Sequence, residues 1–218
     1  MKNKTIILIN GLPRVGKDTS ADFILKKLKS IKISFAGPLK GIVARTFDIT
    51  EDKLEKYKNN PDEYVIDIKK LSVEPTYLNK ILNFFGLETI KKDNVIKTMT
   101  FRKILQLFGT EGIKPEFGKD VWGNLLYQKA LLSDNDIIVV PDYRFMSEYI
   151  PQPGINIIRI LIKDHRELPV EGHASDVELY QNNVKFDYII ENKGTLIELE
   201  KNINSVLTQI EESINVRP

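Results

Sequence analysis

The sequence contains no cysteine, which excludes a disulfide framework, a thiolate metal site and a catalytic thiol, and which suits a reducing cytoplasm. It also has little net charge, because 32 Lys and Arg residues against 30 Asp and Glu residues leave a formal charge of +2. No global field therefore draws the protein to nucleic acid or to an anionic membrane. Long apolar runs are missing as well, since the first one stops at Asn10 and Gly11, short of a membrane span or signal segment. We expect a cytoplasmic protein that binds neither nucleic acid nor a membrane.

What is present is a series of short apolar runs that alternate with helical patterns. A β-branched run over 5–9 predicts a strand covered on both faces, and apolar residues at helical spacing from Ala21 to Leu28 predict a helix after it. A last helix is expected from Leu196 to Ile214. Further strands are expected over 31–35, 136–140, 155–162 and 186–190. The alternation predicts one α/β domain, 1–218, with a central five-stranded parallel sheet between helical layers.

Two stretches interrupt this alternation. The sequence becomes charged and rich in Asn and Lys between Asp48 and Thr100, and we interpret it as part of a mostly helical insertion over about 48–132. The polar stretch 163–176 contains both histidines, His165 and His173, and lies between core elements. Because mobile closing segments have this character, 163–176 is the candidate lid.

The segment from Gly11 to Thr19 has two glycines and a lysine at the spacing of a P-loop, after a predicted buried strand and before a predicted helix. In such a loop, backbone N–H groups and the helix N-terminus surround phosphate oxygens while the lysine reaches the β- and γ-phosphates. The motif predicts a three-layer P-loop NTPase fold. The alternative is a glycine turn that merely joins a strand to a helix. The predicted ATP-binding residues of the loop are Gly11, Arg14, Val15, Gly16, Lys17, Asp18 and Thr19, with Lys17 also catalytic.

The loop departs from the usual pattern at Asp18, where a Ser or Thr commonly ligates magnesium. The hydroxyl arrives one residue later, as Thr19, which we expect to contact the α- or β-phosphate. Two interpretations of Asp18 stay open. Its carboxylate can take part in a Mg²⁺ site, directly or through water, or it can stabilise the first turn of the helix electrostatically.

Several motifs, taken in order along the chain, carry a resemblance to a known family. They are residues 16–19, 34–40, 106–111, 120–122, 142–145 with Glu148, and 173–176. In this order they resemble the motifs of the bacteriophage-type deoxynucleoside monophosphate kinases. The resemblance implies transfer of a phosphoryl group from ATP to a nucleotide with Mg²⁺ as cofactor, a possible homodimer, and the host cytoplasm if the chain is of phage origin. The sequence departs from the usual residues of the family at Gly37, Lys114 and Asp176, and these departures bear on base specificity more than on the reaction.

The residues also suggest an acceptor site. Asp142 and Arg144 follow the most apolar predicted strand at its carboxyl end, where open α/β sheets bind ligands, and Arg144 offers a planar fork for a phosphate. An Asp142–Arg144 ion pair with a structural role is the alternative. The other candidates also have a structural alternative to substrate binding, as aromatic residues of the core or as solvated residues of helices. The predicted substrate-binding residues are Phe35, Lys40, Arg102, Trp122, Asp142, Arg144 and Glu148, and Arg144 is also predicted to be catalytic.

The candidate lid supplies the cation expected over the transferred phosphoryl group. Arg166 lies in this irregular stretch, whereas Arg159 falls inside a strand pattern, so Arg166 is the predicted catalytic residue. We assign no general base, because a phosphate monoester is already anionic near neutral pH. Asn192 and Gly194, after the last predicted strand, resemble the loop in which related kinases hold adenine, or they form only a strand-to-helix turn.

These features predict a kinase that transfers the γ-phosphoryl group of ATP to a (deoxy)nucleoside 5′-monophosphate. A P-loop kinase for another small acceptor, of the dephospho-coenzyme A or phosphomevalonate type, is the second hypothesis. A non-catalytic nucleotide switch is the third. Against the switch, no D-x-x-G motif follows a strand, and Thr195 stands where a guanine-reading N-K-x-D motif has its Asp.

Overall fold

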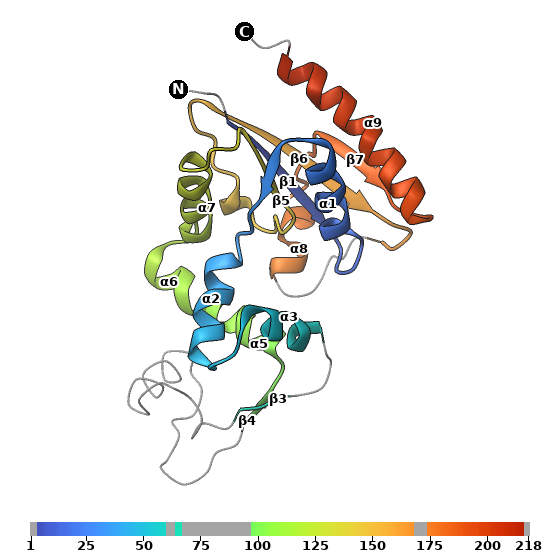
Figure 1. Ribbon diagram of the computed structural model, residues 1–218. Coiled ribbons are helices and arrows are strands. Elements are labelled where there is room, and N and C mark those ends of the chain that lie inside the picture. The colour runs from blue at the N-terminus through green and yellow to red at the C-terminus, as the bar shows by residue number, and fades with distance from the viewer. Residues whose placement is uncertain (1–3, 60–63, 67–96, 168–173, 216–218) are drawn as a thin grey trace. The chain divides into compact units, whose positions relative to one another are not determined.

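The computed structural model describes residues 4–59, 64–66, 97–167 and 174–215 (Figure 1). The chain forms two compact units, the first made of Met1–Phe35 and Trp122–Pro218 and the second of Ala36–Val121. The second unit thus begins earlier than the insertion expected over 48–132, and it also ends earlier. The single domain 1–218 with an insertion stays a prediction. Residues Tyr77, Phe84 and Phe85 of the expected insertion lie outside the described residues.

A five-stranded parallel sheet forms the centre of the first unit, as predicted. Its strands are β1 (Lys4–Gly11), β2 (Ser30–Lys32), β5 (Ile137–Val140), β6 (Ile155–Lys163) and β7 (Tyr188–Glu191), in the order β2-β5-β1-β6-β7. Thr5 of the central strand is in register with Ile137 on one side and Asn156 on the other. The carboxyl ends of β1 and β5 are therefore neighbours, although more than a hundred residues separate them along the chain.

The strand expected over 31–35 is shorter than predicted. Strand β2 ends at Lys32, and the next backbone groups take other partners. The Ile33 amide still donates to the Val139 carbonyl at 3.0 Å, but the Phe35 amide donates to Asp142 Oδ1 at 2.9 Å. A carboxylate from the neighbouring loop thus replaces the sheet ladder at this point.

Helices cover both faces of the sheet. Ile7 and Ile9 of β1 belong to an apolar cluster with α1 (Lys17–Lys27) and α9 (Leu196–Asn215), and Figure 1 shows these two helices side by side. Because side chains alternate along a strand, Ile6 and Leu8 point to the opposite face, where they are also fully buried. Figure 1 places α7 (Val121–Leu131) on that side of the sheet. The result is the predicted three-layer arrangement, and the P-loop NTPase fold is confirmed.

The last helix begins where the sequence indicates. The Thr195 hydroxyl accepts a hydrogen bond from the Glu198 amide at 3.3 Å, while Glu198 Oε2 accepts one from the Thr195 amide at 2.6 Å. This reciprocal pair is a capping box, which satisfies two amides that the first turn would otherwise leave without a partner. Leu199, Ile203 and Leu207 then face the sheet at helical spacing.

The second unit is built mainly from short helices around aromatic residues. They are α2 (Gly37–Thr46), α3 (Glu51–Asn59), α5 (Phe101–Gln106), the π-helical segment η2 (Leu107–Ile113) and α6 (Lys114–Phe117), with an antiparallel pair β3 (Tyr64–Ile66) and β4 (Lys97–Met99). The Phe101 ring stacks on Tyr57 and meets the edge of Phe47, with ring centroids 5.5 Å apart in both pairs. Such contacts hold α5 against its neighbours.

Among the helices of the described residues, none combines the length and the apolar character that a membrane crossing requires.

Candidate active site

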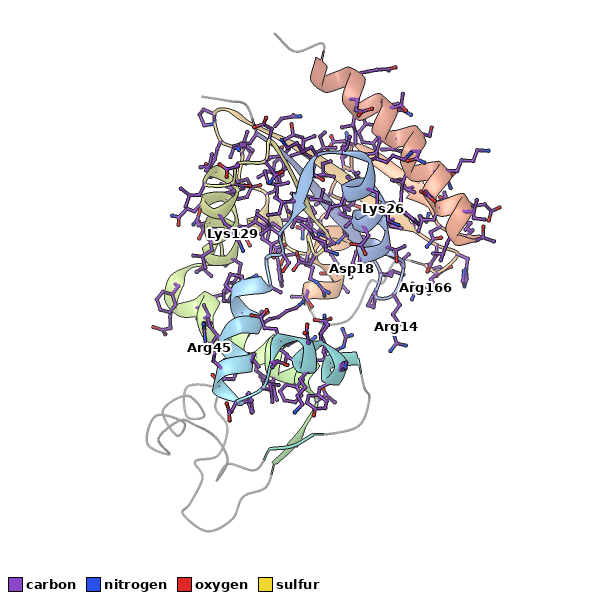
Figure 2. All side chains as sticks on the ribbon, in the orientation of Figure 1. Arg14, Asp18, Lys26, Arg45, Lys129 and Arg166 are labelled. Atoms are coloured by element: carbon purple, nitrogen blue, oxygen red, sulfur yellow. The ribbon has the colours of Figure 1, made fainter. Side chains whose placement is uncertain are left out.

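The loop after β1 has the backbone that a P-loop requires. Gly11 has φ +151°, and a Cβ there would collide with the Ile162 carbonyl and with Val15. Gly16 has φ +93°, and its Cβ would lie 2.9 Å from Asn192 Nδ2. Both positions therefore require glycine for conformation and for space. Arg14 also adopts a left-handed φ of 63°, and its side chain is exposed at the tip of the loop (Figure 2). The backbone is strained at this sharp turn into α1.

Lys17, the first residue of α1, has its ammonium group folded back over this loop. Its Nζ donates to the carbonyls of Gly11 at 2.7 Å and Leu12 at 2.8 Å. These carbonyls hold the cation beside the place where the amides and the N-terminus of α1 favour an anion. A phosphate that binds there has the ammonium within reach.

A pocket in the first unit brings the two predicted catalytic residues Lys17 and Arg144 together. Its lining residues are Asn10, Gly11, Pro13, Lys17, Arg144, Ser175 and Tyr180.

Buried hydrogen bonds shape the loop that carries Arg144. The Asn10 side chain donates from Nδ2 to the Tyr143 carbonyl at 2.7 Å, and the Tyr143 amide donates to the Ile9 carbonyl at 3.2 Å. Glu148 Oε2 accepts from the amides of Arg144 at 2.7 Å and Phe145 at 3.0 Å. The loop is therefore fixed to the end of β1 on one side and to the short 3-10 helix η3 (Met146–Glu148) on the other.

Glu148 is 3% exposed, so its structural contribution is to hold this loop. Its direct contact with a base or sugar stays a prediction. Asp142, another predicted substrate residue, ties the loop to Phe35 through the bond already described. Burial of Tyr143, next to it, raises the pKa of the phenol well above its ordinary value, so this ring stays neutral.

The candidate lid reaches the P-loop through Arg166. Its guanidinium pairs with Asp164 through Nε at 2.7 Å and Nη2 at 2.5 Å, and Nη2 also donates to the Pro13 carbonyl at 3.1 Å. The hydrogen bond from Arg166 lowers the pKa of Asp164, which keeps the pair charged. Figure 2 shows Arg14 and Arg166 at the same end of the first unit. His173 of the candidate lid lies outside the described residues.

Asn192, a predicted ATP-binding residue, also lies at the P-loop. Its Nδ2 donates to the Val15 carbonyl at 2.9 Å, and its amide donates to the Lys163 carbonyl at 2.7 Å. The turn between β7 and α9 is thus bound to the loop and to the end of β6. Gly194 follows in this turn, and a Cβ there would overlap the Glu198 carboxylate that caps α9.

The remaining predicted residues divide between the two units. Asp18 is exposed and Thr19 half-buried on the first turn of α1. Phe35 and Trp122 are buried, at 2% and 6% exposure, so that stacking on a base stays a prediction for both. Lys40 of the second unit pairs with Glu55 at 2.9 Å, and Arg102 is half-buried on α5.

The predicted site omits four residues that line the pocket, Asn10, Pro13, Ser175 and Tyr180, although Pro13 lies within the P-loop segment and Ser175 within the motif 173–176. Ser175 and Tyr180 lie on α8 (Ala174–Gln181), whose first residues belong to the candidate lid. The Tyr180 hydroxyl donates to Asn10 Oδ1 at 2.6 Å. A polar residue at the end of an otherwise apolar strand was the available signal for Asn10, whereas nothing local distinguishes Tyr180 from a core aromatic.

Comparison with known proteins agrees with this geometry. The family model described as deoxynucleotide monophosphate kinase matches residues 57–203. A curated deoxynucleotide monophosphate kinase of Escherichia phage RB69 is 24% identical over 93% of this chain and 99% of its own length. Its counterpart from Enterobacteria phage T4 is 25% identical over 93% and 98%.

Among solved structures, a dephospho-CoA kinase from Campylobacter jejuni superimposes with a TM-score of 0.43 at 17% identity, over 98% of this chain and 99% of its own. A likeness this distant adds nothing to the assignment. The family match, in contrast, spans most of the chain and includes the Arg144 loop, α8 and Asn192. The chain belongs to the deoxynucleotide monophosphate kinase family.

Proposed function

We propose that this protein transfers the γ-phosphoryl group of ATP to a deoxynucleoside 5′-monophosphate and releases ADP and the deoxynucleoside diphosphate. One observation carries the proposal: Lys17 of the P-loop and Arg144 of the β5 loop line the same pocket. Two cationic side chains that line one pocket suit a reaction that brings two phosphate chains together. The family and the relatives named above support the choice of nucleotide.

The chemistry asks mainly for positioning and charge neutralisation. An oxygen of the acceptor monophosphate attacks the γ-phosphorus, the bond from that phosphorus to the β–γ bridging oxygen breaks, and ADP leaves with the electron pair. The attacking oxygen is already anionic near neutral pH, so the step needs no general base. We assign the β- and γ-phosphates to Lys17 and the loop amides, and the acceptor phosphate to the fork of Arg144.

Arg166 is proposed to neutralise charge on the transferred group. Its hydrogen bond to the Pro13 carbonyl of the P-loop supports this proposal. Its raised pKa, which follows from the hydrogen bond to Asp164, keeps the guanidinium charged. Lys40 and Arg102 of the second unit are proposed to contact the acceptor.

Magnesium is proposed as the cofactor, held by phosphate oxygens, water and the Asp18 carboxylate. Mg²⁺ in phosphoryl-transfer sites commonly uses one or two carboxylates together with substrate phosphates, and Asp18 is exposed on the first turn of α1 beside Lys17. A single carboxylate beside bound phosphates fits this pattern. When bound, it would neutralise charge that develops on the β- and γ-oxygens.

An acceptor panel tests the function. The purified protein is incubated with ATP, Mg²⁺ and each of the matched ribo and deoxy monophosphates, and ADP is measured with a coupled assay. We expect acceptor-stimulated turnover with one or more deoxynucleoside monophosphates. Turnover with dephospho-coenzyme A or phosphomevalonate alone, or slow ATP hydrolysis that no acceptor stimulates, would contradict the proposal.

The proposal also includes a cellular location and an oligomeric state. Relatives from phages support action in the cytoplasm of a host cell. The proposal of a homodimer rests on the family resemblance. Light scattering of the protein as it elutes from a sizing column tests it, and a measured mass equal to that of one 25.1 kDa chain would exclude the dimer.

A further inference from the structure

The peptide group between Tyr143 and Arg144 is held at both ends. Its carbonyl oxygen accepts the bond from Asn10 Nδ2 at 2.7 Å, and its N–H donates to Glu148 Oε2 at 2.7 Å. A peptide group is planar, so fixing its two polar ends fixes its orientation. The next amide, of Phe145, also donates to Glu148 Oε2 at 3.0 Å, so the backbone is held on both sides of the Arg144 Cα, and with it the direction in which the side chain leaves.

The amide of Asn10 is oriented by a residue from a different part of the chain. A side-chain amide can present either its oxygen or its NH₂ group to a neighbour, and the hydrogen bonds around it decide which. The Tyr180 hydroxyl donates to Oδ1 at 2.6 Å, which leaves Nδ2 for the Tyr143 carbonyl. Asn10 is 6% exposed, so water competes little for either bond.

Asn10 is also the last residue before Gly11, the first glycine of the P-loop. Its backbone continues into the loop that carries Lys17, and its side chain holds the loop that carries Arg144. The Asn10 side chain is therefore one of the links between the two loops that carry the cations of the pocket.

We propose that Asn10 and Tyr180 are positioning residues for phosphoryl transfer: through the Tyr143–Arg144 peptide group they set Arg144 opposite Lys17. This inference rests on the proposed function. It assigns Tyr180 a role through Asn10 rather than a contact with substrate, because its hydroxyl donates to the buried amide.

Tyr180→Phe is the direct test, since it removes one hydroxyl and keeps the ring that packs in the pocket. A buried hydrogen bond of this kind corresponds to about a fivefold change in an equilibrium, so we expect kcat/KM for the acceptor to fall about fivefold. The KM for ATP should change less than about twofold, because the P-loop amides and Lys17 are untouched. Tyr188→Phe is the matched control, because Tyr188 is a half-buried tyrosine of β7 with no role in the pocket, and it should leave both constants unchanged.

A double-mutant cycle with Arg144→Ala separates positioning from a general loss of structure. If Tyr180 acts through Arg144, the double variant should be no slower than Arg144→Ala alone. Effects that multiply independently would overturn the inference, and so would wild-type kinetics for Tyr180→Phe. A second variant, Asn10→Leu, removes both bonds at similar volume and should cost more than Tyr180→Phe; an equal or smaller loss would also overturn it.

The two proposals fail in different ways. If the wild-type protein shows no acceptor-stimulated turnover, the proposed function fails before any variant is compared. If the wild-type protein is active and the cycle is additive, only the positioning inference fails.

Discussion

Replacing Lys17 by methionine removes the ammonium group and retains most of the stem, so it tests the P-loop assignment directly. In the structure the ammonium satisfies the carbonyls of Gly11 and Leu12 at the edge of an open pocket. Water can replace it there, so the free energy of unfolding should fall by at most about 1 kcal/mol. For a chain of this length that corresponds to a melting temperature lower by roughly 2–4 °C.

The effect on the reaction should be much larger. In the transition state the ammonium faces charge that spreads over the β- and γ-phosphates, and removing one such donor costs at least about 3 kcal/mol. We expect kcat/KM to fall by about 100-fold or more, while ATP binding weakens less, because the loop amides remain.

The assay combines steady-state kinetics, nucleotide binding by calorimetry and a thermal melt. Lys26→Met is the control, since Lys26 is an exposed lysine in the last turn of the same helix (Figure 2). It removes the same charge from α1 and should retain wild-type turnover. A folded Lys17→Met protein with kcat within about threefold of wild type would refute the assignment of Lys17.

Three further predictions concern single charges. Arg144→Lys should lose nearly as much kcat/KM as Arg144→Ala, because a point charge cannot reproduce the bidentate fork, and full activity of the lysine variant in the acceptor assay would reduce the site to general electrostatics. Asp18→Asn should raise the Mg²⁺ concentration for half-maximal rate at saturating substrates; an unchanged midpoint, with at most about 1 kcal/mol of lost stability in the melt, would leave Asp18 only its role in the first helical turn. Burial acts to raise the pKa of Glu55, but its hydrogen bonds to Lys58 and Lys40 outweigh this and lower the pKa to about 2. The ionised group therefore stabilises the fold above its ordinary pKa of 4.5, and this contribution is lost as the pH falls from 4.5 towards 2. Glu55→Gln should accordingly be less stable than wild type at pH 7, and the difference in denaturant midpoint should vanish near pH 2; a difference that does not depend on pH would contradict the ion pairs.

The parts of the fold that were predictable depend on local patterns. Strand β1, the glycine turn and α1 follow one another within a short segment, and each has a pattern that needs no distant partner to be recognised. The start of α9 was predictable for the same reason, because it depends on a local pattern from Leu196 onward. The bounds of β2 were not, since they depend on a carboxylate from Asp142 that lies 107 residues away along the chain.

The candidate site shows the same division. Lys17 could be proposed from the spacing of the P-loop motif, and Arg144 because parallel strands place their carboxyl ends at one edge of the sheet. The part played by Tyr180 could not, because it contacts Asn10 across 170 residues of sequence. Glu148 illustrates a different difficulty: its sequence position suggested substrate, whereas its burial and its bonds to two backbone amides depend on the path of a loop that no pattern specifies.

The strand order also has a consequence for synthesis on the ribosome. Strand β1 precedes its partners β5 and β6 along the chain, and Thr5 meets Ile137 and Asn156. At about 5–20 residues per second, the apolar run of β1 waits on the order of ten seconds before either neighbour exists. Strand β2, which is made next, pairs with β5 instead. Strand β1, which is buried along nearly its whole length in the folded protein, therefore stays without its sheet partners through most of translation.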